Sequence, residues 1–244
     1  MKNLFVFLFI GMIALTSCKK DDEGEIMTKI NFKLMHKVDG QDLELDKIKY
    51  QNAAGNSYSV INLKYFVSSF VLHKSTGEKI VLSDVHYVDI SDSSTLSFSP
   101  ETVIPNGDYN QISFVFGLNE TENTDGRFPN PPLNAMEWPV PLGGGYHYMK
   151  LEGKYDNAGQ ITNYNTHTGA TNGTPYHVEV SLPVSFTLSG TESTAEIIMD
   201  INKWYQDPNV YDFSVYGMMI MGNGDAQKVI QENGANVFSI GDIN

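Results

Sequence analysis

Short apolar segments with strand-like patterning recur along most of this chain and leave little room for helices. Residues 28–36 alternate, with Phe32, Leu34 and His36 on one face, which is typical of a strand with one buried side. Further segments rich in β-branched and aromatic residues follow at short spacing, separated by turn signals such as Pro105-Asn106-Gly107-Asp108. About ten such strands predict an all-β fold, a single-domain antiparallel β-sandwich.

The remaining elements follow from the same signals. Strands are expected at residues 28–36, 58–72, 80–82, 87–90, 109–118, 176–188 and 194–201. A hairpin turn is expected at residues 75–78, and a long loop at residues 119–132, where glycine and proline occur without periodicity. Helix is limited to a single turn at Trp204 and a short C-terminal helix at residues 225–233, ended by Gly234.

The N-terminus predicts export and lipid anchoring. Residues 1–17 contain Lys2, an apolar run and a small-residue end, as a secretory signal peptide does. The single cysteine, Cys18, stands where bacterial lipoprotein signals place the residue that becomes lipidated. Residues 18–27 then form an acidic tether that resembles those of Bacteroidetes lipoproteins, and residues 28–244 form the folded domain. The expected protein is an outer-membrane lipoprotein, facing the periplasm or exposed at the surface, with the lipid as its only membrane attachment.

The charge of the chain restricts its partners. The formal net charge is −13 at pH 7, and loss of Lys2 with the signal peptide makes it −14. Such a surface repels nucleic acid and anionic lipid, and it suits a soluble envelope domain or a cation binder. We therefore expect no nucleic-acid partner.

Catalytic motifs are missing from the sequence. It has no GxSxG elbow, no P-loop and no GxGxxG after a strand, and its one thiol is Cys18. A pair of glycosidase carboxylates stays open because such groups meet only in three dimensions. Glu152 is the candidate for it, although a salt bridge or turn cap is its more common role. We expect a binding protein and not an enzyme.

Candidate metal ligands gather in residues 143–169, which hold two of the six histidines. His147 and Met149 lie two apart in an expected strand and should share a face. Imidazole with thioether suits copper, above all Cu(I). His167 lies in a turn-prone segment that can return to the same end of the sheet, and His36 ends the apolar face of the first strand.

The other histidines and the late methionines have ordinary explanations as well. His86 is a core histidine or a fourth ligand, whereas His73 and His177 adjoin turns and are expected to be solvated. Clustered methionines usually pack in a core, but near copper they can add soft ligands. The cluster consists of Met218, Met219 and Met221.

Aromatic residues offer a different function. An exposed aromatic platform would bind sugars by stacking, although aromatics are more often buried in a sandwich. The platform residues would be Trp138, Tyr146, Tyr148, Tyr155 and Tyr164. The alternative prediction is thus a lipoprotein that binds a glycan or surface polymer.

Several segments occur in an order that resembles the MbnP-like family of envelope copper-binding proteins. They are FKLMH (32–36), NAAG (52–55), YFVSS (65–69), PNGDYNQISFVFG (105–117), MEW (136–138), GYHYMKLEG (145–153) and HTG (167–169). The resemblance implies a β-sandwich that binds copper, often beside a dihaem enzyme of the MauG type. Family members often have two tryptophans in M-F-W-x-W; this chain keeps Trp138, which the resemblance makes a candidate for redox chemistry.

The resemblance also orders the ligand candidates. His36 and His167 match histidines of the family and become the first choices, with His147 or Met149 as helpers. The prediction is one copper ion, Cu(I) or Cu(II), held between the first strand and the end of residues 143–169. The predicted function is copper uptake, storage or handling.

Overall fold

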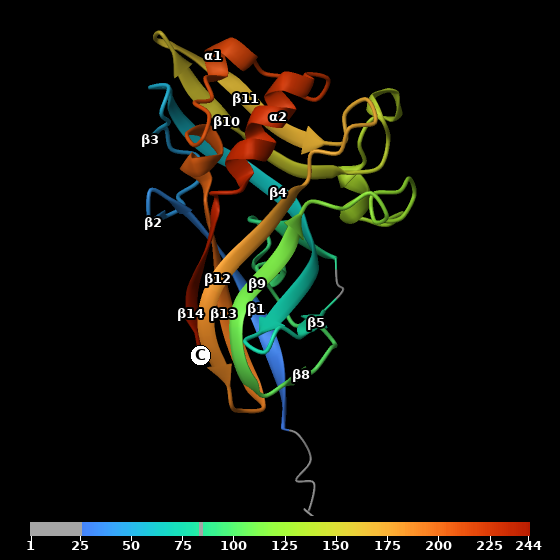
Figure 1. The fold of residues 1–244 in the computed structure, drawn as a ribbon. Helices are drawn as coiled ribbons and strands as arrows, with labels where there is room; N and C mark the ends of the chain where they lie inside the picture. The colour runs from blue at the N-terminus through green and yellow to red at the C-terminus, as the bar shows by residue number, and fades with distance from the viewer. Residues whose placement is uncertain (1–25, 83–84) are drawn as a thin grey trace, which may run out of the picture.

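Two β-sheets form the body of the molecule (Figure 1). The computed structural model describes residues 26–82 and 85–244. The expected signal peptide, Cys18 and most of the expected tether lie outside these residues. Within the described part of the chain, no helix is long and apolar enough to cross a membrane.

The larger sheet has eight strands, and β4 is its centre. The strands are β3 (Tyr50–Gln51), β4 (Ser57–Lys74), β5 (Lys79–Val81), β6 (His86–Asp89), β9 (Gly107–Phe116), β10 (His147–Asn157), β11 (Gln160–Gly169) and β12 (Val178–Leu188). The main order is β11-β10-β4-β9-β12, with β3, β5 and β6 also paired to β4. The β4–β5 hairpin confirms the turn expected at residues 75–78.

The smaller sheet has six strands and brings both ends of the described chain together. The strands are β1 (Met27–Val38), β2 (Gln41–Asp42), β7 (Ser97–Phe98), β8 (Ile104–Pro105), β13 (Glu192–Asp200) and β14 (Phe238–Ile243). The main order is β14-β13-β1-β2, and β7 and β8 also pair with β1. The β1–β13 pair is parallel, whereas the other pairs of this sheet are antiparallel.

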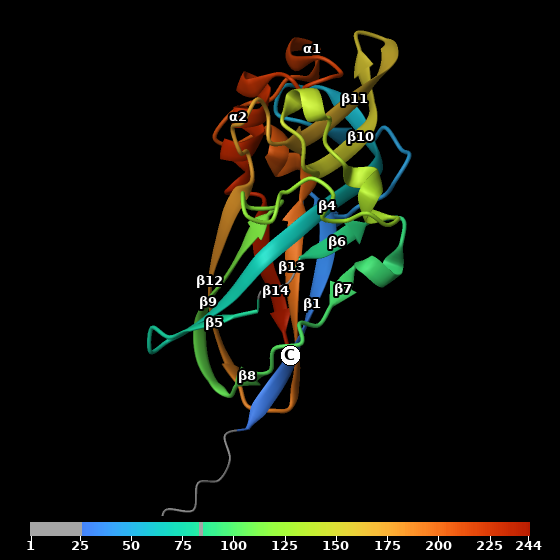
Figure 2. The same ribbon diagram turned by 90° about the vertical axis from the view of Figure 1, so that its right-hand side faces the viewer.

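The core lies between the two sheets (Figure 2). Phe32 of β1 contacts Phe70 of β4, with ring centroids 4.8 Å apart. Phe116 of β9 meets Phe238 of β14 at 5.3 Å. The apolar residues that alternate in residues 28–36 therefore form a buried inner face, as expected. The predicted all-β sandwich is confirmed.

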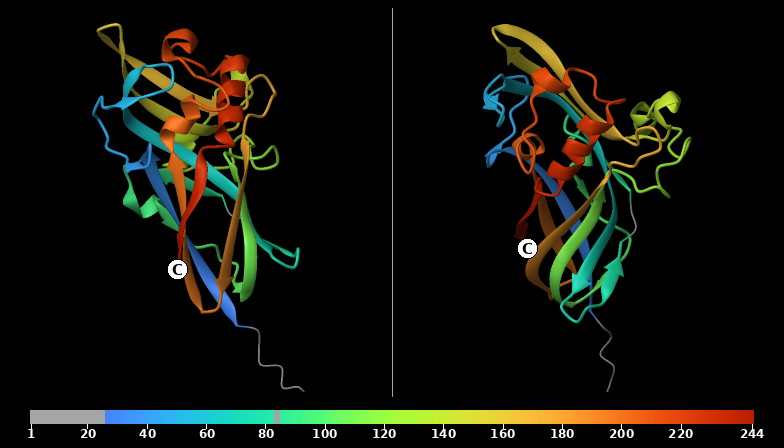
Figure 3. Two further views of the ribbon diagram at one scale, coloured as in Figure 1. Left: turned by 60° about the vertical axis from the view of Figure 1, so that its left-hand side comes forward. Right: turned by 45° about the horizontal axis from the view of Figure 1, so that its top comes forward.

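Both α-helices lie at the end of the molecule where β10 and β11 lie (Figures 1 and 3). The α-helices are α1 (Phe213–Tyr216) and α2 (Gly224–Gly234), and the 3-10 helices are η1 (Ser93–Thr95), η2 (Leu133–Met136), η3 (Val140–Leu142) and η4 (Ile201–Tyr205). The side chain of Asn223 caps α2 by accepting a hydrogen bond from the Ala226 amide. The expected C-terminal helix and the turn at Trp204 are confirmed.

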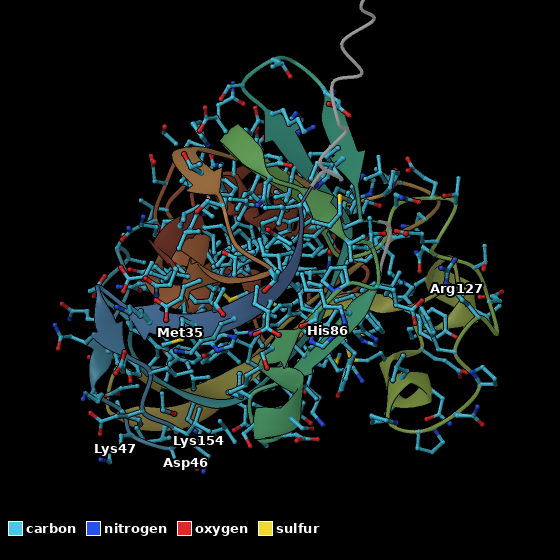
Figure 4. All side chains as sticks on the ribbon, turned by 90° about the horizontal axis from the view of Figure 1, so that it is seen from below. Met35, Asp46, Lys47, His86, Arg127 and Lys154 are labelled. Atoms are coloured by element: carbon cyan, nitrogen blue, oxygen red, sulfur yellow. The ribbon has the colours of Figure 1, made fainter. Side chains whose placement is uncertain are left out.

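The loop of residues 119–132 projects from the side of the sandwich, where Arg127 marks it in Figure 4. Its base is fixed to the segment that enters β10: Asn123 accepts a hydrogen bond from the Tyr146 amide at 2.7 Å, and Asp125 accepts one from the Gly145 amide at 2.5 Å. A Cβ at Gly145 would lie 2.4 Å from the Asn123 Oδ1, and φ there is 77°. Glycine is required at this position on both counts.

The largest differences from the prediction are in β11 and β14. Residues 160–169 form strand β11 throughout, so His167 lies in a strand and not in a turn. The last strand, β14, was not expected at all.

Candidate metal centre

The β10–β11 hairpin presents a polar row on the outer face of the larger sheet. In its antiparallel register Lys150 lies opposite His167, and Glu152 opposite Asn165. These four side chains are half-buried, while those between them on both strands are buried. Because side chains on a strand alternate between faces, this row points away from the core between the sheets.

A carboxylate fixes the orientation of His167. The His167 Nε2 lies 2.7 Å from the Glu152 Oε1, and the Asn62 amide donates to the Glu152 Oε2 at 3.1 Å. The hydrogen bond from His167, ahead of that from Asn62, lowers the pKa of Glu152 to about 2. An ionised carboxylate only accepts hydrogen bonds, so the His167 Nε2 carries a proton. In the neutral ring the lone pair is then on Nδ1.

A backbone carbonyl fixes the orientation of His147. Its Nδ1 lies 3.0 Å from the Met136 carbonyl oxygen at the end of η2. A carbonyl accepts only, so Nδ1 holds the proton and Nε2 the lone pair. Burial, with a smaller contribution from the charge of Lys150, lowers the pKa of His147 to about 3. This imidazole is neutral across the physiological range.

The two imidazoles face one another. Their ring centroids are 5.2 Å apart and the rings are nearly perpendicular, at 83°. Two imidazoles bound to one ion at a nitrogen–metal distance of about 2.0 Å, with a tetrahedral angle between them, have centroids about 5 Å apart. Metal-binding histidines also typically donate their second ring nitrogen to a carboxylate or carbonyl. His147 and His167 meet both conditions.

Trp138 forms a wall of this site. Its ring centroid lies 4.7 Å from that of His147 in an edge-on arrangement, and the side chain is 2% exposed. A Cβ at Gly169 would come within 2.5 Å of the Trp138 ring, so glycine there lets the indole pack against β11. Within the described residues, the buried Trp138 Nε1 has no hydrogen-bond partner.

A methionine-lined cavity adjoins His167. It has a volume of about 200 Å³ and is lined by Asn165, His167, Met218, Met219 and Met221. Met218 and Met219 are 48% and 82% exposed. These methionines therefore do not serve the packing role that is usual for such a cluster.

Met149 faces away from this site. It pairs with Thr168, whereas its neighbour Lys150 pairs with His167, so the Met149 side chain points to the core, where it is fully buried. The predicted common face of His147 and Met149 is wrong. A register shift between these two residues breaks the alternation of β10 and turns His147 toward His167.

His36 lies on the same inner side as Met149. Its Nε2 is 3.0 Å from the hydroxyl of Tyr65, a buried core residue paired with Met149. Burial lowers the pKa of His36 to about 4. His36 and His167 thus lie on opposite faces of the larger sheet, and the structure does not bring the predicted ligand pair together.

The other histidines have separate environments. His86 stacks on Phe98 at 4.4 Å and donates from Nε2 to the Thr95 carbonyl at 2.7 Å, as a packed histidine does. The His73 Nε2 lies 2.8 Å from the Ser113 hydroxyl. Contrary to the expected solvation, the His177 Nδ1 is buried, without a hydrogen-bond partner among the described residues.

The aromatic platform is not exposed. Its five members are at most 4% exposed, so their ring faces are unavailable to a sugar. They are Trp138, Tyr146, Tyr148, Tyr155 and Tyr164.

The carboxylate beside the two imidazoles, Glu152, is occupied by hydrogen bonds from His167 and Asn62. Among residues 26–82 and 85–244, no group of three or more His, Cys, Asp or Glu side chains is arranged to hold a metal ion. Apart from Glu152, the donors near this site are two imidazoles and neighbouring thioethers, a set that suits copper better than zinc, calcium or magnesium. One feature of the sequence could have predicted the contact between His147 and His167: both lie in a single segment that forms a hairpin.

Comparison with known proteins agrees with this architecture. A solved structure described as MbnP from Methylosinus trichosporium matches with a TM-score of 0.56 over 88% of this chain and 98% of that chain, at 13% sequence identity. A comparison with curated proteins finds no match. The MbnP family model matches residues 27–221, most of the chain. This protein belongs to the MbnP family.

Proposed function

We propose that this chain is a copper-binding protein of the cell envelope, in which His147 and His167 hold one copper ion for uptake, storage or handling. The observation that carries the proposal is the contact of the two imidazoles, 5.2 Å between centroids, with one nitrogen of each ring committed to an oxygen acceptor. Membership of the MbnP family supports copper as the metal.

The site is built for binding before the ion arrives. The Met136 carbonyl and the Glu152 carboxylate hold the rings in place, so little side-chain freedom is lost on binding. His147 needs no deprotonation near neutral pH, because its pKa is about 3, and copper requires the neutral imidazole. We assign the chain a binding role and no catalytic step.

The envelope location is part of the proposal. It rests on the signal-like residues 1–17 and on Cys18 as the lipid-bearing residue. A lipid anchor at Cys18 would keep the domain at the outer membrane, on its periplasmic or external face. A dihaem enzyme of the MauG type stays a proposed partner, with Trp138 beside the site as the residue it would act on.

Copper titration of the purified domain tests the site. A His147→Ala/His167→Ala variant should bind copper at least 100-fold more weakly than the wild type, because both anchored imidazoles are removed. His73→Ala is the matched control, since His73 is also a strand histidine but lies against Ser113. It should bind copper as the wild type does.

His36→Ala distinguishes the structure from the sequence prediction. Copper affinity should be unchanged in this variant, because His36 lies on the opposite face of the larger sheet. Equal affinity in the wild type and the His147→Ala/His167→Ala variant would remove the proposed site, and a loss confined to His36→Ala would restore the sequence prediction.

A further inference from the structure

The segment between α1 and α2 runs beside β11 (Figure 3) and contains three methionines. Met218, Met219 and Met221 fall within four consecutive positions and line one cavity with His167. The residue between them, Ile220, is fully buried. Ile220 therefore anchors the segment, and the three methionines are left around the cavity.

Hydrogen bonds hold this segment against β11. The Met218 Sδ lies 3.6 Å from the Thr162 hydroxyl, and the Thr171 hydroxyl donates to the Met221 carbonyl at 2.8 Å. The fully buried Gln227 side chain donates to the carbonyls of both Ile220 and His167, at 3.0 and 2.8 Å. The position of the methionines relative to His167 is thus built into the fold.

The lining of the cavity is chemically selective. It consists of three thioethers, one imidazole and one amide, with no carboxylate among the lining residues described. Thioethers are soft, neutral ligands that favour Cu(I) over Cu(II), zinc or the hard cations. An exposed methionine such as Met219, 82% exposed, is also placed to meet an ion arriving from solvent.

His167 belongs to both sites, since it lines the methionine cavity and contacts His147. We infer that the methionine cavity is an entry site for Cu(I), in which the three thioethers capture the ion and pass it to the imidazole pair by way of His167. The inference rests on the proposed copper function and adds the oxidation state and the route. The step is a ligand exchange: copper–sulfur bonds break as copper–nitrogen bonds form, and copper stays Cu(I).

The experiment measures, under anaerobic conditions, the rate at which Cu(I) passes from a chromogenic chelator to the protein, and it measures Cu(II) affinity separately. The test variant is Met218→Leu/Met219→Leu/Met221→Leu, which keeps apolar volume and removes sulfur. It should take up Cu(I) at least 10-fold more slowly and bind Cu(II) with unchanged affinity. Met35→Leu, a half-buried methionine on β1 outside the cavity, is the matched control and should change neither the rate nor the affinity.

A second variant separates this inference from the proposed function. His147→Ala breaks the imidazole pair but leaves the methionine cavity, so it should lose Cu(II) and keep a Cu(I) site in which X-ray absorption detects sulfur ligands. Copper binding that needs both histidines, with an equal rate of Cu(I) uptake in the triple leucine variant and no sulfur ligand, would overturn the entry site alone. Methionine-dependent Cu(I) binding that survives His147→Ala/His167→Ala unchanged would overturn the imidazole site and the transfer to it.

Discussion

At the scale of single residues, hydrogen bonds and ring contacts together separate the two histidines proposed as copper ligands from the others. His147 and His167 each spend one ring nitrogen on an oxygen acceptor and keep the other. His86 donates to a carbonyl too, but its ring is stacked on Phe98. His36 is half-buried on the inner side of the larger sheet, where its Nε2 lies 3.0 Å from the Tyr65 hydroxyl. Residue type alone could not distinguish these cases.

His36 should make the stability of the domain depend on pH. Its folded-state pKa is about 4, below the ordinary value of 6.5, so the unfolded chain takes up a proton at a pH where the folded chain does not. Stability should therefore fall as the pH drops from about 6.5 to about 4, by up to about 3 kcal/mol. Denaturant unfolding at a series of pH values measures this loss.

The control for this pH dependence is His36→Gln, which can still bond the Tyr65 hydroxyl but does not titrate. As the pH falls through this window, the unfolding free energy of the wild type should decrease relative to that of His36→Gln. A constant difference from pH 7 to pH 4 would contradict the assignment.

At the scale of elements, the sequence predicts strands well where one face is apolar. Phe32 and Leu34 of β1 show their alternation openly. Strand β11 hides it, because its inward residues include Thr166 and Thr168; the Thr166 hydroxyl is buried and lies 3.0 Å from that of Tyr205. Strand β14 is short and contains Gly241, so it carries little strand signal.

Only part of the candidate site could be predicted from the sequence. Residues 143–169 were identified as its location, but which of their side chains share a face depends on the strand register. The shift between His147 and Met149 is a one-residue irregularity set by tertiary contacts, and the sheet to which β1 belongs depends on a partner strand far away in sequence. Neither is encoded in local periodicity.

Gln227 links α2 to β11 and should control the position of the segment between α1 and α2, which carries the three methionines. Gln227→Met should destabilise the fold by about 2–3 kcal/mol, because buried carbonyls of His167 and Ile220 lose their donor. Hydrogen exchange should become faster at residues 217–222. Gln231→Met is the matched control on the same helix, since its side chain binds the His177 carbonyl instead. Equal exchange in the two variants would contradict this role.

At the scale of the whole molecule, the C-terminal segment completes both layers. The family match ends at residue 221, yet β14 pairs with β13, and Phe238 contacts the rings of Phe114, Phe116 and Trp204. Residues 222–244 are therefore part of the core in this chain.

Removing residues 222–244 should abolish cooperative folding, as measured by thermal unfolding followed by circular dichroism. A milder change is Phe238→Ala, which should lower the free energy of unfolding by about 3–5 kcal/mol because it leaves a cavity. Val215→Ala, at a side chain that is 73% exposed, should change stability by less than about 0.5 kcal/mol. A truncated chain with a sharp transition near that of the full chain would refute this requirement.

The parallel pairing of β1 with β13 has a consequence for how the chain reaches this structure. Lys29 lies opposite Glu192, and Lys37 opposite Asp200, so the first strand to leave the ribosome cannot form its long parallel pairing until one of the last strands has been made. Pairings this distant in sequence raise the contact order and slow folding. Until then the edge of β1 that pairs with β13 stays without its partner strand, and such late folding suits the export proposed above.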